Sequence, residues 1–133
     1  MKPIENVEEI VRDSFGLWIT GLFGSIISWN PGLSFEEHKE AFFWLIEQLL
    51  REGKVKFVAP GADCYTSTEH PSPQLTIEDD EAQWHEAPEA IVEYLRALWP
   101  EHVRDERDLD LVMYFYSIPG IIWVGKDGSF VAS

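Results

Sequence analysis

Side chains that could do chemistry are spread along this sequence without forming a catalytic motif. The four histidines have no zinc-ligand spacing to one another or to Cys64, the one cysteine. His85 and Glu89 are four residues apart, but Pro88 between them and the missing third ligand argue against a metal site. The sequence also has no G-x-S-x-G, Walker A or G-x-G-x-x-G motif. We therefore expect no metal, no cofactor and no enzymatic activity.

Cys64 is the side chain that could act as a nucleophile if folding placed a histidine beside it. The adjacent Asp63 should raise the pKa of the Cys64 thiol, because a nearby negative charge disfavours the thiolate. His38 falls on the apolar side of a predicted helix, where a histidine is more often part of the core than a general acid or base. An enzyme with a dispersed active site stays open as an alternative.

Negative charge is the most informative property of the sequence. Its 24 acidic residues outnumber its 10 lysines and arginines, so the net charge is −14. Residues 61–110 hold 14 of the acids and three of the bases, and no lysine or arginine occurs between Lys56 and Arg96. Such a surface attracts basic proteins and repels polyanions, which disfavours direct binding to nucleic acid. The four acids at 78–81 lack the alternating ligands and central glycine of a calcium loop.

Two tryptophans lie among these acids. Trp44 projects from the polar side of its predicted helix, and Trp84 lies within the acidic segment 78–89. An exposed ring surrounded by carboxylates suits recognition of a basic protein, since the ring anchors the partner and the charges steer it. The alternative is that other parts of the chain cover both rings and the acids only maintain solubility. The candidate partner-binding residues are Glu36, Glu40, Trp44, Glu47, Asp79, Asp80, Glu81, Trp84, Glu86 and Glu89.

A long helix from Phe35 to Glu52 should organise the fold. Ser34 and Glu37 have the spacing of a capping box, and apolar side chains then recur with helical period. Gly53 stands where a left-handed C-cap is expected, and 54–58 alternates like a strand. A helical stripe from Ile4 to Phe15 could continue into the glycine-containing run to residue 29 or be broken there, and Pro88 should open a third helix that Pro100 ends.

The C-terminal part is expected to be sheet. The runs 111–116 and 121–124 are typical of strands, and residues 125–128 should form a hairpin turn into 129–131. Residues 64–66 and 74–77 could also form short strands within a long loop. The predicted fold is therefore α+β, one domain over residues 1–133, with about three helices packed on one face of a mostly antiparallel sheet.

Length and composition place limits on location. The chain has 133 residues, enough for one core without disulfides, and its single cysteine favours a reducing compartment. The N-terminus lacks a basic region followed by an apolar one, so no signal peptide is expected. The uncharged run from Ser14 to Trp29 is shorter than the ~20 residues of a membrane span. These features predict a cytoplasmic protein that does not enter a membrane.

Three segments resemble a family of small bacterial proteins of unknown function. They read FEEHKEAFFWL at 35–45, LLREGKVK at 49–56 and PGIIWV at 119–124, followed by Asp127 and Gly128. The resemblance covers the first half of the chain and the C-terminal hairpin but not residues 61–85, and it implies no catalytic residues. In type, a small, acidic, single-domain protein also resembles the immunity proteins of bacterial contact-dependent toxin systems.

Charge, the missing catalytic motif and this resemblance together favour one function. We expect an immunity protein, or antitoxin, that binds and neutralises a cognate basic toxin domain such as a nuclease, and that is a monomer when free. An adaptor or binding module that uses Trp44 in a groove is the other alternative, besides a dispersed-site enzyme.

Overall fold

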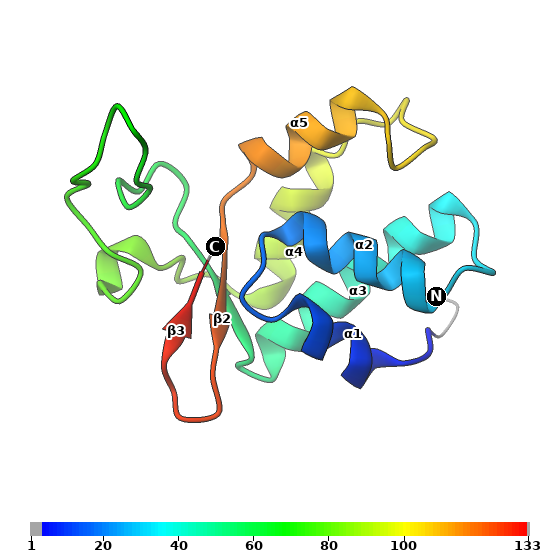
Figure 1. Cartoon of the computed structure of the whole chain (residues 1–133), viewed down its shortest axis with the longest axis horizontal. Helices are drawn as coiled ribbons and strands as arrows, with labels where there is room; N and C mark the ends of the chain where they lie inside the picture. Colours follow the sequence, from blue (N-terminus) through cyan, green and yellow to red (C-terminus); the bar gives the residue numbers. More distant parts are fainter. Residues whose placement is uncertain (1–3, 133) are drawn as a thin grey trace.

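The computed structural model describes residues 4–132 and has an α+β fold of five α-helices and a three-stranded antiparallel sheet (Figure 1). The helices and strands are α1 (Val7–Ser14), α2 (Ile19–Trp29), α3 (Phe35–Arg51), β1 (Val55–Phe57), the 3-10 turn η1 (Asp80–Ala82), α4 (Pro88–Ala97), α5 (Leu109–Ser117), β2 (Ile121–Val124) and β3 (Phe130–Val131). The antiparallel sheet was predicted correctly. The expected number of helices was too low, and the packing of three helices on one face of the sheet stays a prediction.

The long helix α3 begins and ends as its sequence predicts. Ser34 Oγ accepts a hydrogen bond from the Glu37 amide at 3.1 Å, and the Ser34 amide donates to Glu37 Oε1 at 2.9 Å. Gly53 has a φ of +70°, so the left-handed C-cap is also confirmed. The chain then turns directly into β1, because the Lys54 amide reaches back to the Leu49 carbonyl at 2.9 Å.

Replacing Ser34 by alanine should destabilise this start of α3. The variant loses the side-chain acceptor that serves the Glu37 amide, and we expect a loss of about 1 kcal/mol in the free energy of unfolding. Urea denaturation measures it, and Ser34→Asp, which restores an acceptor, should recover most of the loss. Equal stability of wild type and Ser34→Ala would contradict the capping role.

The buried side of α3 belongs to an aromatic core contributed by three helices and the turn after α4. Phe42 and Phe43 of α3 are fully buried. Their rings and those of the neighbouring elements pack edge to face or tilted, at centroid separations of 5.2 to 6.1 Å. We call this cluster the aromatic core; its members are Phe23, Phe42, Phe43, Trp99, Tyr114 and Phe115.

The sheet joins the middle of the chain to its end. β2 is the central strand and pairs with β1, with Val55 opposite Trp123, and with β3, with Val124 opposite Phe130. Trp123 is fully buried, and its indole N–H donates to the Leu17 carbonyl at 2.9 Å, which ties the sheet to the connection between α1 and α2. In Figure 1 the sheet stands beside the helices, and the long connection from β1 to α4 extends from its other side.

The N-terminal run forms two helices. Phe15 leaves the helical conformation, and Gly16 has a φ of +82°, which a residue with a side chain rarely adopts. The chain resumes as a helix at Ile19, so the apolar stripe that spans both segments belongs to two elements. Residues 1–3, part of the segment considered for a signal peptide, lie outside the described residues.

The strand expected at 111–116 is wrong, since this run lies in α5. Asp108 caps the helix by accepting the Asp110 amide at 2.9 Å, and Leu111, Tyr114 and Phe115 face the core with helical spacing. The helical period was hidden because the outer face is also apolar: Leu109, Met113 and Tyr116 are 70%, 58% and 70% exposed. The short strands suggested for 64–66 and 74–77 are not formed either, because both stretches are irregular and the Cys64 and Leu75 amides donate to carbonyls within the loop.

Across residues 4–132, none of the helices combines the length and the apolar character that crossing a bilayer requires.

Candidate partner-binding surface

Two of the predicted acidic stretches meet along the contact between α3 and α4. Arg51 of α3 binds Glu47 one turn earlier and Glu89 at the start of α4, both at 3.2 Å. Arg96 of α4 binds Glu40 of α3 at 2.7 Å, and this hydrogen bond holds the pKa of Glu40 below its usual value. We call these five residues the α3–α4 seam. Its three carboxylates share two arginines, so it keeps a net negative charge, but each carboxylate already has an internal partner.

A second group of acids is more open. Asp79, Asp80 and Glu81 form the acidic turn at η1, and all three are exposed. Asp79 accepts the Thr76 amide at 2.7 Å, and Asp80 lies 3.0 Å from the imidazole of His85. No arginine or lysine pairs with the acidic turn among the ion pairs of residues 4–132. These carboxylates therefore carry charge that a partner could meet.

Backbone contacts connect the acidic turn to the α3–α4 seam. Gln83 forms an antiparallel bridge with Val58, and the Trp84 amide donates to the Phe57 carbonyl at 2.9 Å. The chain then runs past the exposed Glu86 to the start of α4, where Glu89 contacts Arg51. The segment 79–89 thus follows one path from the edge of the sheet to the end of α3, and it keeps its acids along that path.

The two tryptophans have different surroundings. Trp84 is half-buried against the core, and its ring meets Tyr94 edge to face at 4.9 Å, so most of its surface is already covered. Trp44 is 39% exposed, and it lines a groove of about 960 Å³ between α1, the C-terminal half of α3 and the β2–β3 hairpin. The lining of the groove also includes Phe15, which is exposed, and both basic and acidic side chains, such as Lys126 and Glu52. Trp44 is therefore the more accessible of the two predicted anchors.

Glu36 completes the set of sequence-predicted residues. It is exposed in the first turn of α3, where an acidic side chain suits the positive end of the helix dipole. It lies at the other end of α3 from Arg51. In the structure Arg51 binds Glu47 and Glu89, and Arg96 binds Glu40. Glu36 lies one turn before Glu40 and has no such arginine partner among the ion pairs of residues 4–132.

The surroundings of Cys64 do not activate its thiol. Partial burial and the charge of Asp63 both raise the pKa of the Cys64 thiol, in the direction expected from the sequence. The nearby His70 binds the Asp63 carboxylate at 2.9 Å. Asp63 also accepts the Gln74 amide at 3.1 Å, and these hydrogen bonds lower the pKa of its carboxyl. The Asp63 carboxylate therefore closes the loop 63–74 by binding both the His70 ring and the Gln74 backbone amide.

His38 lies in the core, as expected. It is buried, and its Nε2 donates to the Asn30 carbonyl at 2.7 Å. Asn30 in turn binds the Glu5 backbone with both its side-chain oxygen and its amide. His38 and Asn30 together hold the N-terminal segment at Glu5 against the turn before α3.

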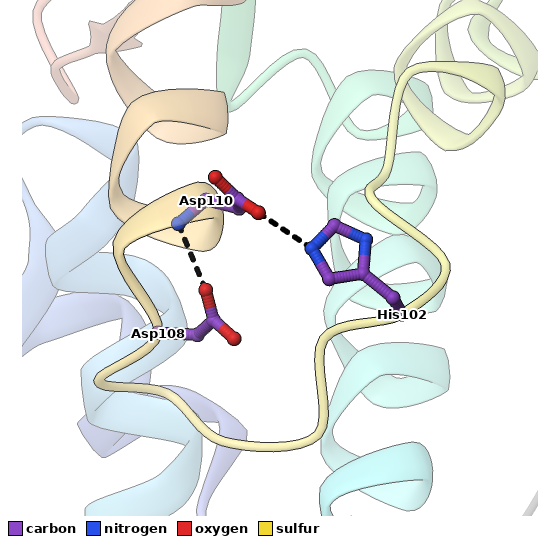
Figure 2. A group of neighbouring side chains, drawn as sticks. All are labelled: His102, Asp108 and Asp110. Atoms are coloured by element: carbon purple, nitrogen blue, oxygen red, sulfur yellow. Dashed lines mark hydrogen bonds and ion pairs between the residues drawn. The ribbon is translucent and has the colours of Figure 1, made fainter.

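A cluster that the sequence did not predict gathers at the start of α5 (Figure 2). His102, Asp108 and Asp110 hold their ligand-type atoms within 4.8 Å of one another, although they are separated along a charged connector. His102 Nε2 lies 2.5 Å from Asp110, and Asp108 is occupied as the N-cap of α5. Acidic groups at the start of a helix complement its dipole, so the cluster is accounted for as a helix cap.

Comparison with solved structures supplies a bacterial neighbour. An uncharacterised protein conserved in bacteria, from Neisseria meningitidis, superposes with a TM-score of 0.64 at 25% identity, covering 93% of this chain and 84% of that one. No known family and no curated protein matches the chain. The fold described above is therefore shared with a protein from a bacterium over nearly the whole length of this chain.

Proposed function

We propose that this protein is an immunity protein: it binds a cognate basic toxin domain in the cytoplasm and blocks the toxin's active site or nucleic-acid groove. The observation that carries the proposal is the acidic turn at Asp79, Asp80 and Glu81. Its three carboxylates are exposed, and nine acids but no lysine or arginine occur between Lys56 and Arg96. A nuclease domain holds its substrate with basic side chains, which such a turn could occupy in place of phosphates.

The acids that lack an arginine or lysine partner and those that are bound by arginines would contribute differently to binding the toxin. Asp79, Asp80, Glu81 and Glu86 are exposed and have no lysine or arginine partner among the described residues, so they would act mainly on the association rate and the orientation of the complex. The α3–α4 seam would contribute a fixed framework, because its acids are held by Arg51 and Arg96. Trp44 could serve as a hydrophobic anchor beside this framework.

A charge-reversal experiment tests this assignment. The triple variant Asp79→Lys, Asp80→Lys, Glu81→Lys should bind the toxin encoded beside this gene at least about 100-fold more weakly than wild type, chiefly through slower association at low salt. The matched control reverses Glu101, Asp105 and Glu106, three exposed acids on the connector before α5, and changes the net charge equally. The control should lose less than about tenfold, because only long-range steering is affected.

The contact site and the immunity function are tested by different measurements. Equal losses in the two triple variants, measured by surface plasmon resonance, would contradict the acidic turn as the contact. A strain lacking this gene should be inhibited when it grows beside toxin-producing parent cells, and unimpaired growth would contradict the immunity function itself.

The groove at Trp44 favours a second candidate, an adaptor that binds a partner through apolar contacts. Its volume of about 960 Å³ lies within the range of ligand sites. Binding that is abolished by Trp44→Ala but unchanged by salt and by the charge reversals would identify the adaptor.

A further inference from the structure

A second, smaller pocket lies on the side of the molecule where α5 ends. It has a volume of about 240 Å³ and is lined by segments from four parts of the chain: the α1–α2 connection, the loop after β1, α4 and the end of α5. This is less than the ~300 to 1,000 Å³ of sites for drug-sized ligands, so it suits one small group or a single side chain. We call it the aromatic pocket because it contains Trp18, Tyr65, Tyr94 and Tyr116.

Hydrogen bonds fix two walls of the aromatic pocket. The Trp18 indole N–H donates to the Phe115 carbonyl at 2.7 Å, and the Tyr65 hydroxyl accepts the Gly120 amide at 2.9 Å. The two rings meet edge to face at 6.4 Å. A Cβ on Gly120 would lie 3.2 Å from the Tyr65 hydroxyl and 3.3 Å from the Trp18 ring, so both side chains pack closely against the backbone there. The pocket is thus partly pre-formed.

The other two aromatic walls are more open. Tyr94 is held by Trp84, whose ring contacts it at 4.9 Å, while Tyr116 is 70% exposed at the rim. Such aromatic faces carry negative electrostatic potential, which attracts an ammonium or guanidinium group.

The electrostatic surroundings also favour a cation. Tyr116 and Ser117 form the last turn of α5, so the negative end of its helix dipole lies at the pocket. No lysine or arginine is among the described residues that line it. Tyr65 and Tyr94 both lie in the stretch between Lys56 and Arg96, which contains no lysine or arginine. An anion would meet no positive partner there.

We infer that the aromatic pocket binds a small organic cation, an alkylammonium or guanidinium group held against the four aromatic rings at the C-terminal end of α5. The group could come from a free quaternary ammonium compound or from a lysine or arginine side chain of a bound protein. The inference goes beyond the proposed function and does not depend on it, since a pocket without affinity for cations would leave toxin neutralisation untouched.

Two pairs of probes test the inference, each a cation and its uncharged isostere. Choline is compared with 3,3-dimethylbutan-1-ol, and Nα-acetylarginine amide with Nα-acetylcitrulline amide, at constant chloride concentration. Binding is followed by NMR through the Trp18 indole N–H and the Gly120 amide. In at least one pair the cation should bind about fivefold or more tightly than its isostere. A preference within the first pair points to a free cation, and one within the second to a protein side chain.

Variants at the rim complete the test. Tyr116→Leu removes an exposed ring without disturbing the core and should weaken cation binding about fivefold, while Tyr116→Phe keeps the ring and should keep the affinity. Trp44→Leu, an exposed ring in the other groove, is the matched control and should have no effect. Equal binding of cation and isostere in both pairs, or equal effects of Tyr116→Leu and Trp44→Leu, would overturn the inference.

Discussion

Phe42→Ala should lower the free energy of unfolding by about 3–5 kcal/mol, which is a large part of the stability of a domain of this size. Phe42 is fully buried at the centre of the aromatic core. Its ring lies 5.2 to 5.7 Å from those of Phe23, Phe43 and Phe115, which come from α2, α3 and α5. Truncation therefore removes apolar burial and opens a cavity bounded by three helices that cannot easily collapse.

The neighbouring helix position supplies the control. Trp44→Ala deletes an even larger side chain from the same turn of α3, but Trp44 is 39% exposed. We expect that variant to lose about 1 kcal/mol or less, since surface substitutions rarely cost more. Guanidinium denaturation followed by circular dichroism measures both variants. Comparable losses would mean that Trp44 is a structural residue, which would weaken its assignment as an anchor for a partner.

Tyr114 should make the protein sensitive to alkali. Its ring is buried against Trp99 and its hydroxyl donates to the Leu95 carbonyl at 2.6 Å. Burial raises the pKa of Tyr114 well above its ordinary value of 10.0. Because the folded state resists deprotonation more than the unfolded state, this contribution is complete below about pH 10 and is lost as the pH rises further, by about 1.4 kcal/mol per pH unit.

The difference between two variants isolates this effect from other groups that titrate in alkali. Tyr114→Phe should cost about 1 kcal/mol at pH 7, for the lost hydrogen bond, and its disadvantage should shrink and then reverse above pH 10. Phe115→Leu, a core substitution without a hydroxyl, should remain destabilised by a constant amount. Urea titrations from pH 8 to about pH 11.5 measure both differences, and parallel pH profiles of wild type and Tyr114→Phe would contradict the prediction.

The elements with local signals could be predicted from the sequence. The capping box at Ser34, the glycine stop at Gly53 and Pro88 at the start of α4 each act through neighbouring backbone groups, so they can be recognised without tertiary structure. α5 could not be recognised in this way, because Leu109 and Tyr116 on its outer face are as apolar as its inner face. Asp108 was the local signal that would have favoured a helix there.

The candidate surface was predictable in composition but not in arrangement. The pairing of Glu47 with Arg51 has i,i+4 spacing and can be recognised in the sequence. The pairing of Glu40 with Arg96 depends on the packing of α4 on α3 and cannot. The aromatic pocket gave no sequence signal, since Trp18 and Tyr65 are brought together by separate connections. A site built from segments that are distant in the sequence can be recognised only once the tertiary structure is known.

The position of β2 between β1 and β3 has a consequence for how the chain is made. A ribosome adds about 5–20 residues per second, so the nascent chain emerges with Val55–Phe57 several seconds before Ile121–Val124 is translated. All five helices of the described residues precede β2, so they can pack together before β2 is available to pair with β1. A transcript truncated before Ile121 would yield a helical product with an open strand edge, a natural target for chaperones and proteases.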